Sequence, residues 1–213
     1  MTTTSFTTGC RRCPRLASFL DETREKYPDY FCRPVPPFGD GAARLLVVGL
    51  APGMHGANAT GRPFTGDYAG VLLYETLHRH GFSTASVSES VDDGLKLIDA
   101  RITNAVKCLP PDNKPVGAEV NTCNDYLAEE LEALADGSII LALGGIAHRA
   151  VVKALGGRQK DFKFAHAAMH ELDRFVLLDS YHCSRYNTNT GRLTAAMFDD
   201  VFSLARQQMD SAS

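Results

Sequence analysis

The sequence predicts an α/β protein, a three-layer α/β/α sandwich with a central, mainly parallel four-stranded sheet. Short apolar runs alternate along the chain with segments of helical periodicity, which is the order of a mainly parallel sheet covered by helices. Three of the four runs are apolar at nearly every residue, as in strands that are buried on both faces. With 213 residues, 44% of them hydrophobic and 22% charged, the chain suffices for one compact domain with a core.

The predicted elements follow one another in a regular order. The segments that predict strands are the apolar runs 45–50 (LLVVGL), 138–143 (SIILAL) and 175–178 (FVLL), together with the mixed segment 101–107 (RITNAVK). Apolar residues at helical spacing predict helices over 70–81, 119–135, 146–155 and 194–208. The first of these helices ends on Gly81, the residue type preferred after a helix. A single domain is therefore expected over 1–213, with frayed ends at 1–8 and 209–213.

Composition and terminal pattern exclude some classes of protein. No run of eighteen apolar residues is present, so no transmembrane helix is expected. The N-terminus lacks the basic-then-apolar order of a secretory signal, which favours a cytoplasmic protein. The net charge of −3 does not indicate a nucleic-acid binder, although a local basic patch can still bind phosphate.

Six cysteines are present, at Cys10, Cys13, Cys32, Cys108, Cys123 and Cys183. In a reducing compartment a disulfide framework is a poor explanation for them. Cys10 and Cys13 form a C-x-x-C, and Cys108 and Cys123 lie fifteen residues apart, which favours a metal ion or cluster. The alternative is that all six are small buried hydrophobic residues.

Three polar segments follow predicted strands, at 49–67, 104–115 and 180–194. Ligands of parallel sheets bind at the carboxyl ends of the strands, so these segments predict a site. The first segment is rich in glycine, which lets backbone N–H groups approach a ligand closely. It contains neither the dinucleotide fingerprint G-x-G-x-x-G nor the Gly-Lys-Ser/Thr of a P-loop.

These three segments resemble the motifs of the uracil-DNA glycosylase superfamily. The most similar branch is family 5, the iron–sulfur enzymes of bacteria and archaea, and the resemblance runs from Cys10 to Thr194. It rests on GLAPGMHGANATGRPFTGD, KCLPPDNKP and SYHCSRYNTNTGRLT. Ala59 stands where members commonly carry arginine, which removes a phosphate contact but leaves the base pocket intact. The resemblance implies a monomeric DNA repair enzyme that removes uracil, and hypoxanthine or xanthine as well, from single- or double-stranded DNA.

The resemblance also implies a cofactor. It assigns a structural [4Fe–4S] cluster to Cys10, Cys13, Cys108 and Cys123. Such a cluster would tie the N-terminal arm to the segment after the second strand. Cys32 and Cys183 have no matching role, and Cys183 is interpreted as a packing residue.

A glycosylase must flip the base into a pocket before it can break the bond. The resemblance implies that Phe64 stacks on the base, although a phenylalanine in the core is the simpler interpretation from sequence alone. Asn104 is expected to bind the base edge, because one amide offers both a donor and an acceptor. Backbone groups of Ala51 and Gly53 are expected to complete the pocket.

The catalytic residues follow from the same motifs. Ala51 carries a methyl group that cannot orient water, and the resemblance assigns this role to Asp67, assisted by Asn113. The alternative for Asp67 is a helix N-cap, since a helix follows directly. His182 is expected to donate to a base carbonyl as negative charge develops there, whereas most lone histidines are structural. His55 is a weaker candidate.

The third polar segment is expected to hold DNA and to enter the base stack, which keeps the base out. Its phosphate-binding candidates are Ser184, Arg185, Asn187, Thr188, Thr190 and Arg192. Arg11, Arg12 and Arg15 are expected to add a basic edge beside the cluster. His166 is also a candidate to face DNA, and the other histidines are expected at the surface or in packing.

Two other classes of function stay open at this point. One is a non-catalytic iron–sulfur protein that binds nucleic acid or senses damage, and the other is a small-molecule phosphate or nucleotide enzyme. The pairing of Asp67 with His182 distinguishes them from a glycosylase, because a binding protein would not need both residues.

Overall fold

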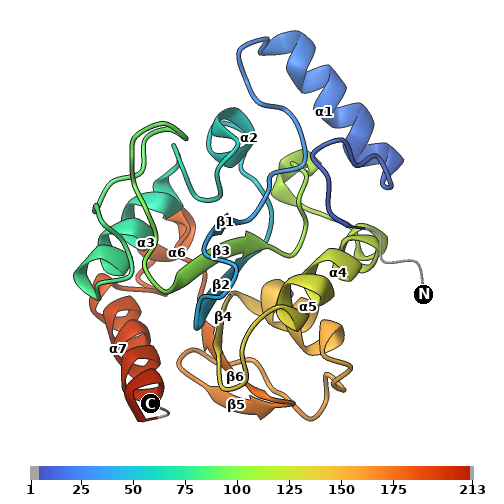
Figure 1. Cartoon of the computed structure of the whole chain (residues 1–213). Coiled ribbons are helices and arrows are strands. Elements are labelled where there is room, and N and C mark those ends of the chain that lie inside the picture. The colour runs from blue at the N-terminus through green and yellow to red at the C-terminus, as the bar shows by residue number, and fades with distance from the viewer. Residues whose placement is uncertain (1–4, 212–213) are drawn as a thin grey trace.

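The computed structural model describes residues 5–211 and contains a sheet of six strands in the order β1-β3-β2-β4-β6-β5 (Figure 1). Its parallel centre consists of β3 (Ala100–Asn104), β2 (Leu45–Gly49), β4 (Ile139–Leu143) and β6 (Phe175–Ser180). These are the four predicted strands. The predicted number of four strands is wrong, because the sheet has six. The two additional strands, β1 (Phe38–Gly39) and β5 (Met169–Leu172), pair antiparallel at its edges. β1 has two residues and β5 is mostly solvent-accessible, so neither forms an apolar run.

Helices cover both faces of the sheet, which confirms the predicted sandwich. On one face lie α3 (Tyr68–Arg79) and α7 (Ala195–Ser211), and on the other lie α4 (Gly117–Glu132) and α5 (Gly145–Ala154) (Figure 1). Alternate residues of β2 supply the two cores: Leu45 and Val47 pack toward α3 and α7, and Leu46 and Val48 pack toward α4 and α5. All residues of β2 are buried, which explains its continuous apolar run.

A third apolar cluster lies beside the sandwich and includes α1 (Pro14–Lys26), which was not predicted. The helix begins at proline, a residue favoured in the first turn of a helix. Leu16 and Leu20 of this helix pack with Val106 and Leu109 of the segment after β3. Its other residues are mostly exposed and charged, so its apolar stripe is narrow.

The short elements all lie within the polar segments. They are α2 (Ala57–Thr60), the 3₁₀ turn η1 (Pro111–Asn113) and α6 (Arg185–Asn189).

Near the ends of the described chain, two side chains pack against the rest of the protein, within the ranges where fraying is expected. The ring of Phe6 lies 5.4 Å from that of Tyr126 in an edge-to-face contact. Met209 is buried in α7, whose apolar face continues past the predicted end. Residues 1–4 and 212–213, included in the same expectation, lie outside the described part of the chain. None of the helices within 5–211 combines the length and apolar character that crossing a membrane requires.

The strand order creates a switch point at the carboxyl ends of the parallel strands. β2 pairs with β3 on one side and with β4 on the other, so the chain changes direction across the sheet at β2. A crevice at such a switch point is the usual ligand site of an open α/β sheet. The three polar segments begin at the carboxyl ends of β2, β3 and β6 and therefore meet at this edge.

Candidate active site

A cavity of about 620 Å³ opens at the carboxyl edge of the sheet. This volume lies within the range of small-molecule sites. All the residues predicted for catalysis or base binding line it: Ala51, Gly53, Phe64, Asp67, Asn104, Asn113 and His182. Ser184 and Arg185 of the predicted DNA-binding set line it as well, whereas Asn187, Thr188 and Arg192 do not.

Phe64 forms one wall of the cavity in an unusual backbone conformation. Its φ is +54°, a left-handed value that is rare for a bulky residue and is found most often at functional sites. The ring stacks near His182, with the centroids 5.9 Å apart and the planes at 28°. A methyl group on Gly49 would lie 2.6 Å from the Phe64 ring, so only glycine fits there. Phe64 is therefore both a core residue and a cavity wall.

Asn104 ends β3 with a buried side chain that is 3% exposed. Its Oδ1 has no hydrogen-bond partner among residues 5–211. A buried oxygen without a donor is costly, and such groups in native proteins call for an explanation. An N–H group of a ligand in the cavity would supply that donor.

Asp67 combines the two roles that the sequence left open. Its Oδ1 accepts a hydrogen bond from the Gly70 N–H at 3.0 Å, which caps the N-terminus of α3. Its Oδ2 faces the glycine-rich segment, where an added methyl group would lie 3.2 Å away on Gly53 and 2.5 Å away on Gly56. Burial raises the pKa of Asp67, and the N–H groups of Gly70 and Ala69 oppose that shift.

His182 lies in the cavity wall just after β6. Burial lowers its pKa to about 4, so the ring is neutral at neutral pH. Within the described residues neither ring nitrogen has a hydrogen-bond partner, while the backbone carbonyl accepts from Asn187 Nδ2 at 2.8 Å. The hydrogen bond from Asn187 fixes the His182 backbone, and the N–H of its neutral ring is free to donate to a ligand.

Asn113 and His55 lie nearer the cavity mouth. Asn113 is exposed, and its φ of +55° is one that asparagine tolerates well. The Nδ1 of His55 is 2.9 Å from the hydroxyl of Tyr30, which links the cavity wall to the segment after α1.

Several predicted phosphate contacts also serve the third polar segment itself. Ser184 Oγ accepts from the Asn187 N–H at 3.4 Å and caps α6. Thr188 Oγ1 donates to the Arg185 carbonyl at 3.1 Å, and Thr190 Oγ1 bonds the Tyr186 carbonyl at 2.8 Å. These bonds shape the segment.

Two arginines of this segment are exposed and face aromatic rings. The Arg185 guanidinium lies 4.9 Å from the ring centre of Tyr68, and that of Arg192 lies 4.7 Å from the ring centre of Tyr181. Neither has a carboxylate partner in the described structure, so both charges are available to an anion.

The expectation of a basic edge from Arg11, Arg12 and Arg15 is wrong, because each arginine is paired with a carboxylate. The pairs are Arg11–Asp21, Arg12–Asp125 at 2.6 Å and Arg15–Glu119 at 2.7 Å. The last two partners are more than one hundred residues away in sequence and are brought close only by folding.

The expectation that His166 faces DNA also lacks support. Its ring stacks on Tyr181 with centroids 5.0 Å apart, and Nδ1 accepts from the Tyr181 N–H at 3.2 Å. His166 therefore packs against the strand end.

Four cysteines, Cys10, Cys13, Cys108 and Cys123, line one small cavity beside α1. In the described structure no three of their sulfurs lie within 4.8 Å of one another. A tetrahedral zinc ion with Zn–S bonds of 2.3 Å would hold its sulfurs about 3.8 Å apart. The arrangement of the four sulfurs is therefore not that of a closed tetrahedral zinc site.

The surroundings of these sulfurs agree with ligation. The Tyr126 hydroxyl donates to Cys10 Sγ and the Lys107 N–H donates to Cys123 Sγ, both at 3.3 Å. Hydrogen bonds to sulfur are a usual feature of iron–sulfur sites. Cys32 lies outside this set next to Asn58, and Cys183 is buried in the core.

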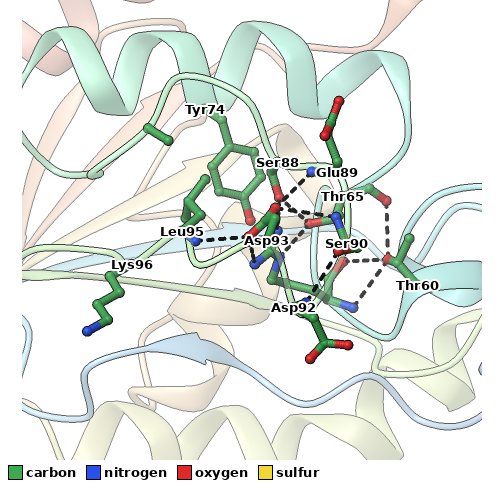
Figure 2. A network of polar contacts seen from close by, with 12 residues as sticks. Thr60, Thr65, Tyr74, Ser88, Glu89, Ser90, Asp92, Asp93, Leu95 and Lys96 are labelled. Atoms are coloured by element: carbon green, nitrogen blue, oxygen red, sulfur yellow. Dashed lines mark hydrogen bonds and ion pairs between the residues drawn. The ribbon is translucent and has the colours of Figure 1, made fainter.

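An ion pair that no sequence motif indicates joins buried Arg62 to the partly buried carboxylate of Asp93, whose other contacts are drawn in Figure 2. Arg62, 3% exposed, directs its guanidinium at the carboxylate of Asp93, with Nη1 and Oδ1 3.0 Å apart. Its Nε donates to Thr65 Oγ1 at 3.0 Å. Figure 2 shows Asp93 also accepting backbone N–H bonds from Glu89, Ser90 and Leu95. The network braces the segment that carries Phe64. Only folding reveals it, because its partners lie 31 residues apart.

We expect Asp93→Asn to destabilise the protein by about 1–3 kcal/mol, because it removes the charge from the hydrogen bonds to Arg62 while the Asp93 side chain is only partly buried. Arg62 holds the pKa of Asp93 well below its usual range. The stabilisation is therefore present above the unfolded pKa of about 3.9 and is lost as the pH falls through the lower folded pKa. Denaturant unfolding at pH 7 and at decreasing pH measures both effects. The exposed neighbour Asp92 is the control, and equal stability of Asp92→Asn and Asp93→Asn at pH 7 would contradict this role.

Tyr186 of α6, which is 73% exposed, was not among the residues predicted for the site. It follows Arg185 at the cavity mouth, in a segment otherwise rich in polar residues. The sequence signal for it was weak, because the same polar segment also contains Tyr181.

The fold and cavity together define an α/β enzyme with its site at the switch point of an open sheet, walled by an aromatic ring and by amide, carboxylate and imidazole groups. A family model, the uracil DNA glycosylase superfamily, matches residues 36–206. The chain belongs to the uracil-DNA glycosylase superfamily.

Individual relatives agree with this assignment. The chain is 45% identical over 206 residues to a type-5 uracil-DNA glycosylase of Thermus thermophilus, covering 94% of each protein. It is 44% identical over 197 residues to a type-5 uracil-DNA glycosylase of Pyrobaculum aerophilum, covering 91% of this chain and 86% of the relative. A type-4 uracil-DNA glycosylase of Archaeoglobus fulgidus is 37% identical over 140 residues, covering 65% of this chain and 56% of the relative. The resemblance inferred from the sequence motifs is thereby confirmed.

Proposed function

We propose that this protein is a DNA repair glycosylase that flips uracil out of DNA and hydrolyses its N-glycosidic bond, leaving an abasic site. The observation that carries the proposal is one cavity in which Phe64, Asp67, Asn104 and His182 converge. The unpaired Oδ1 of Asn104 argues for a ligand with an N–H donor. The non-catalytic alternative needs neither a cavity carboxylate nor a neutral imidazole.

Base binding follows from the walls of the cavity. A flipped uracil would lie against Phe64, and the Asn104 amide would accept from the ring N–H and donate to a carbonyl oxygen. Ala51 and Gly53 line the same space, and we assign them backbone contacts to the base. The Gly53 carbonyl already accepts from Gly56 and Asn58, so its contribution would be the N–H.

The chemistry is a hydrolysis. The bond from the base nitrogen to C1′ breaks, and its electron pair leaves with the base. Water adds to the electron-poor sugar carbon and would release its proton to the Asp67 carboxylate. His182 would donate to the base carbonyl, where negative charge grows, and so stabilise the transition state more than the ground state. The Oδ2 of Asp67 would orient the water and stabilise the positive sugar, with the Asn113 amide assisting.

Single-turnover assays on duplexes and single strands that carry uracil, hypoxanthine, xanthine or thymine, scored as abasic sites, test this proposal. We expect excision of uracil. Hypoxanthine and xanthine are proposed as further substrates because the cavity of about 620 Å³ leaves room for a purine and Ala51 adds little bulk. DNA binding without release of any base would instead support the non-catalytic alternative.

We propose that the third polar segment holds DNA. Alanine at Arg185 or Arg192 should weaken binding to all sequences, and each change should lower the slope of log K against log salt by about 0.9. Fluorescence titration at several salt concentrations measures it. Arg174→Ala is the control, because this partly buried arginine is paired with Asp136 and directly precedes β6, at the amino end of that strand. An unchanged slope in both test variants would show that the segment does not contact phosphates.

We propose a [4Fe–4S] cluster on Cys10, Cys13, Cys108 and Cys123. When bound, it would supply a structural cross-link between the N-terminal arm, α4 and the segment after β3. Cys108→Ser should lose iron and visible absorption and should melt at a lower temperature, whereas Cys32→Ser should keep the colour. A wild-type protein that is folded, active and free of iron after anaerobic purification would contradict the proposal.

The proposed enzyme acts as a monomer in the cytoplasm, where DNA and reduced thiols occur together. Size-exclusion chromatography with light scattering checks the monomer.

A further inference from the structure

A buried polar cluster lies outside the cavity and joins three elements: His148 of α5, His170 of β5 and Asp179 of β6. Asp179 is fully buried and His148 is 1% exposed. His148 Nδ1 lies 2.8 Å from Asp179 Oδ1, and His170 Nε2 lies 3.2 Å from Asp179 Oδ2. The mechanism above uses none of these groups.

The second nitrogen of His148 also faces an acceptor. Its Nε2 lies 3.0 Å from the carbonyl oxygen of Phe162. A neutral imidazole carries one N–H and cannot donate to a carboxylate and a carbonyl together. Both distances are those of hydrogen bonds, so the two contacts together need one more proton than a neutral imidazole beside a carboxylate carries.

The proton belongs on the ring and not on the carboxyl group of Asp179. Imidazole is the stronger base by more than two pKa units, and His170 gives the carboxylate a further donor. Burial by itself lowers the pKa of His148, but the hydrogen bond and negative charge of Asp179 outweigh it and raise the pKa above its usual value. The positive charge of Arg149, the next residue of α5, opposes this effect. Phe162 and Phe164 pack nearby without charge.

The cluster lies directly behind the catalytic histidine of the proposed function. Asp179 is three residues before His182, and the Ser180 carbonyl accepts from the Gly144 N–H at 2.8 Å. The His148 N–H donates to the Gly144 carbonyl at 3.1 Å. A methyl group on Gly144 would lie 3.6 Å from His182 Cβ, so Gly144 backs the His182 side chain. The cluster therefore ties the start of α5 to the strand end that carries His182.

We propose that His148 is a positioning residue held as an imidazolium, and that the buried His148–Asp179–His170 triad fixes the strand end from which His182 enters the cavity. The charge state stands on the geometry alone, and the effect on excision rests on the proposed function.

The charge state is tested by ¹⁵N-resolved NMR of the histidine rings in the whole protein. We expect both ring nitrogens of His148 to carry protons at pH 7. A ring with a single proton would overturn the proposal. So would a stoichiometric divalent metal, found by elemental analysis, that is lost in His148→Gln while the iron content is unchanged.

The stability of the protein gives a second test that does not depend on activity. Because the folded pKa of His148 is raised, its charge stabilises the fold fully below about pH 6.5, and this contribution is lost as the pH rises through the folded pKa. The difference in unfolding stability between wild type and His148→Gln should therefore shrink from pH 6 to pH 9. A constant difference would contradict the imidazolium.

Positioning is tested with a double-mutant cycle. His148→Gln should lower single-turnover excision by about 10- to 100-fold, the effect of misplacing a reacting group, with little change in DNA binding. The same change in a His182→Ala background should have almost no further effect, because the group it positions is gone. An equal loss in both backgrounds would indicate a merely structural role and overturn the proposal.

His78→Gln is the control, since the only hydrogen bond that its ring makes in the described structure is to the Ser83 carbonyl. If the wild type excises no uracil, the proposed function fails while the two charge tests still stand.

Discussion

Replacing His182 with alanine is expected to slow the excision of uracil by about 10²–10³-fold, the cost of losing one preorganised donor. The donor acts on charge that exists only in the transition state, so the affinity for uracil-containing DNA should stay nearly constant. Single-turnover excision and equilibrium binding on the same samples separate the two quantities.

The protonation state of His182 adds a further expectation. Since burial lowers its pKa to about 4, excision by the wild type should show no titration of this ring between pH 5 and pH 8. His55→Ala is the matched control, because His55 lines the same cavity but is bonded to Tyr30. Excision near the wild-type rate by His182→Ala would overturn the proposed role.

Asp67→Asn is expected to cut excision by about 10²–10⁴-fold, the range for losing a positioned acid or base, while melting stays close to wild type. Asparagine is as good an N-cap as aspartate, so the hydrogen bond to Gly70 can persist while the negative charge is removed. Asp67→Ala removes the cap as well and should cost about 1 kcal/mol of stability. Asn113→Ala should have an intermediate effect on excision, because an amide can orient water but cannot take its proton.

The pH dependence of the wild type tests the same carboxylate. Burial raises the pKa of Asp67, and the proposed role requires the ionised form. Excision should therefore decline as the pH falls through a value above that of an ordinary aspartate. Normal excision by Asp67→Asn together with a lower melting temperature of Asp67→Ala would show that Asp67 is a cap alone.

The strands illustrate what a sequence pattern can and cannot reveal. The run at 45–50 predicted β2, because a central parallel strand is buried on both faces and is therefore apolar at nearly every residue. β5 pairs with only one neighbour and is mostly accessible to solvent, so its sequence, MHEL, has no such apolar run. Helix α1 was not predicted for a related reason. It buries only a narrow apolar stripe, so its sequence shows little helical periodicity.

The sequence by itself determined the sandwich and the three polar segments at one edge of the sheet, because strand order and local pattern decide which segments share an edge. The individual residues expected in the cavity followed from the resemblance of its motifs to a known family. Only the tertiary structure decided how those groups are paired. Folding placed one oxygen of Asp67 on a helix cap and the other at the cavity, and it neutralised Arg12 and Arg15 with distant carboxylates. It also set His148 between two acceptors, where the ring must carry a charge. Burial and hydrogen bonding between residues far apart in sequence leave no local pattern, so protonation states and ion pairs become visible only when the chain is folded.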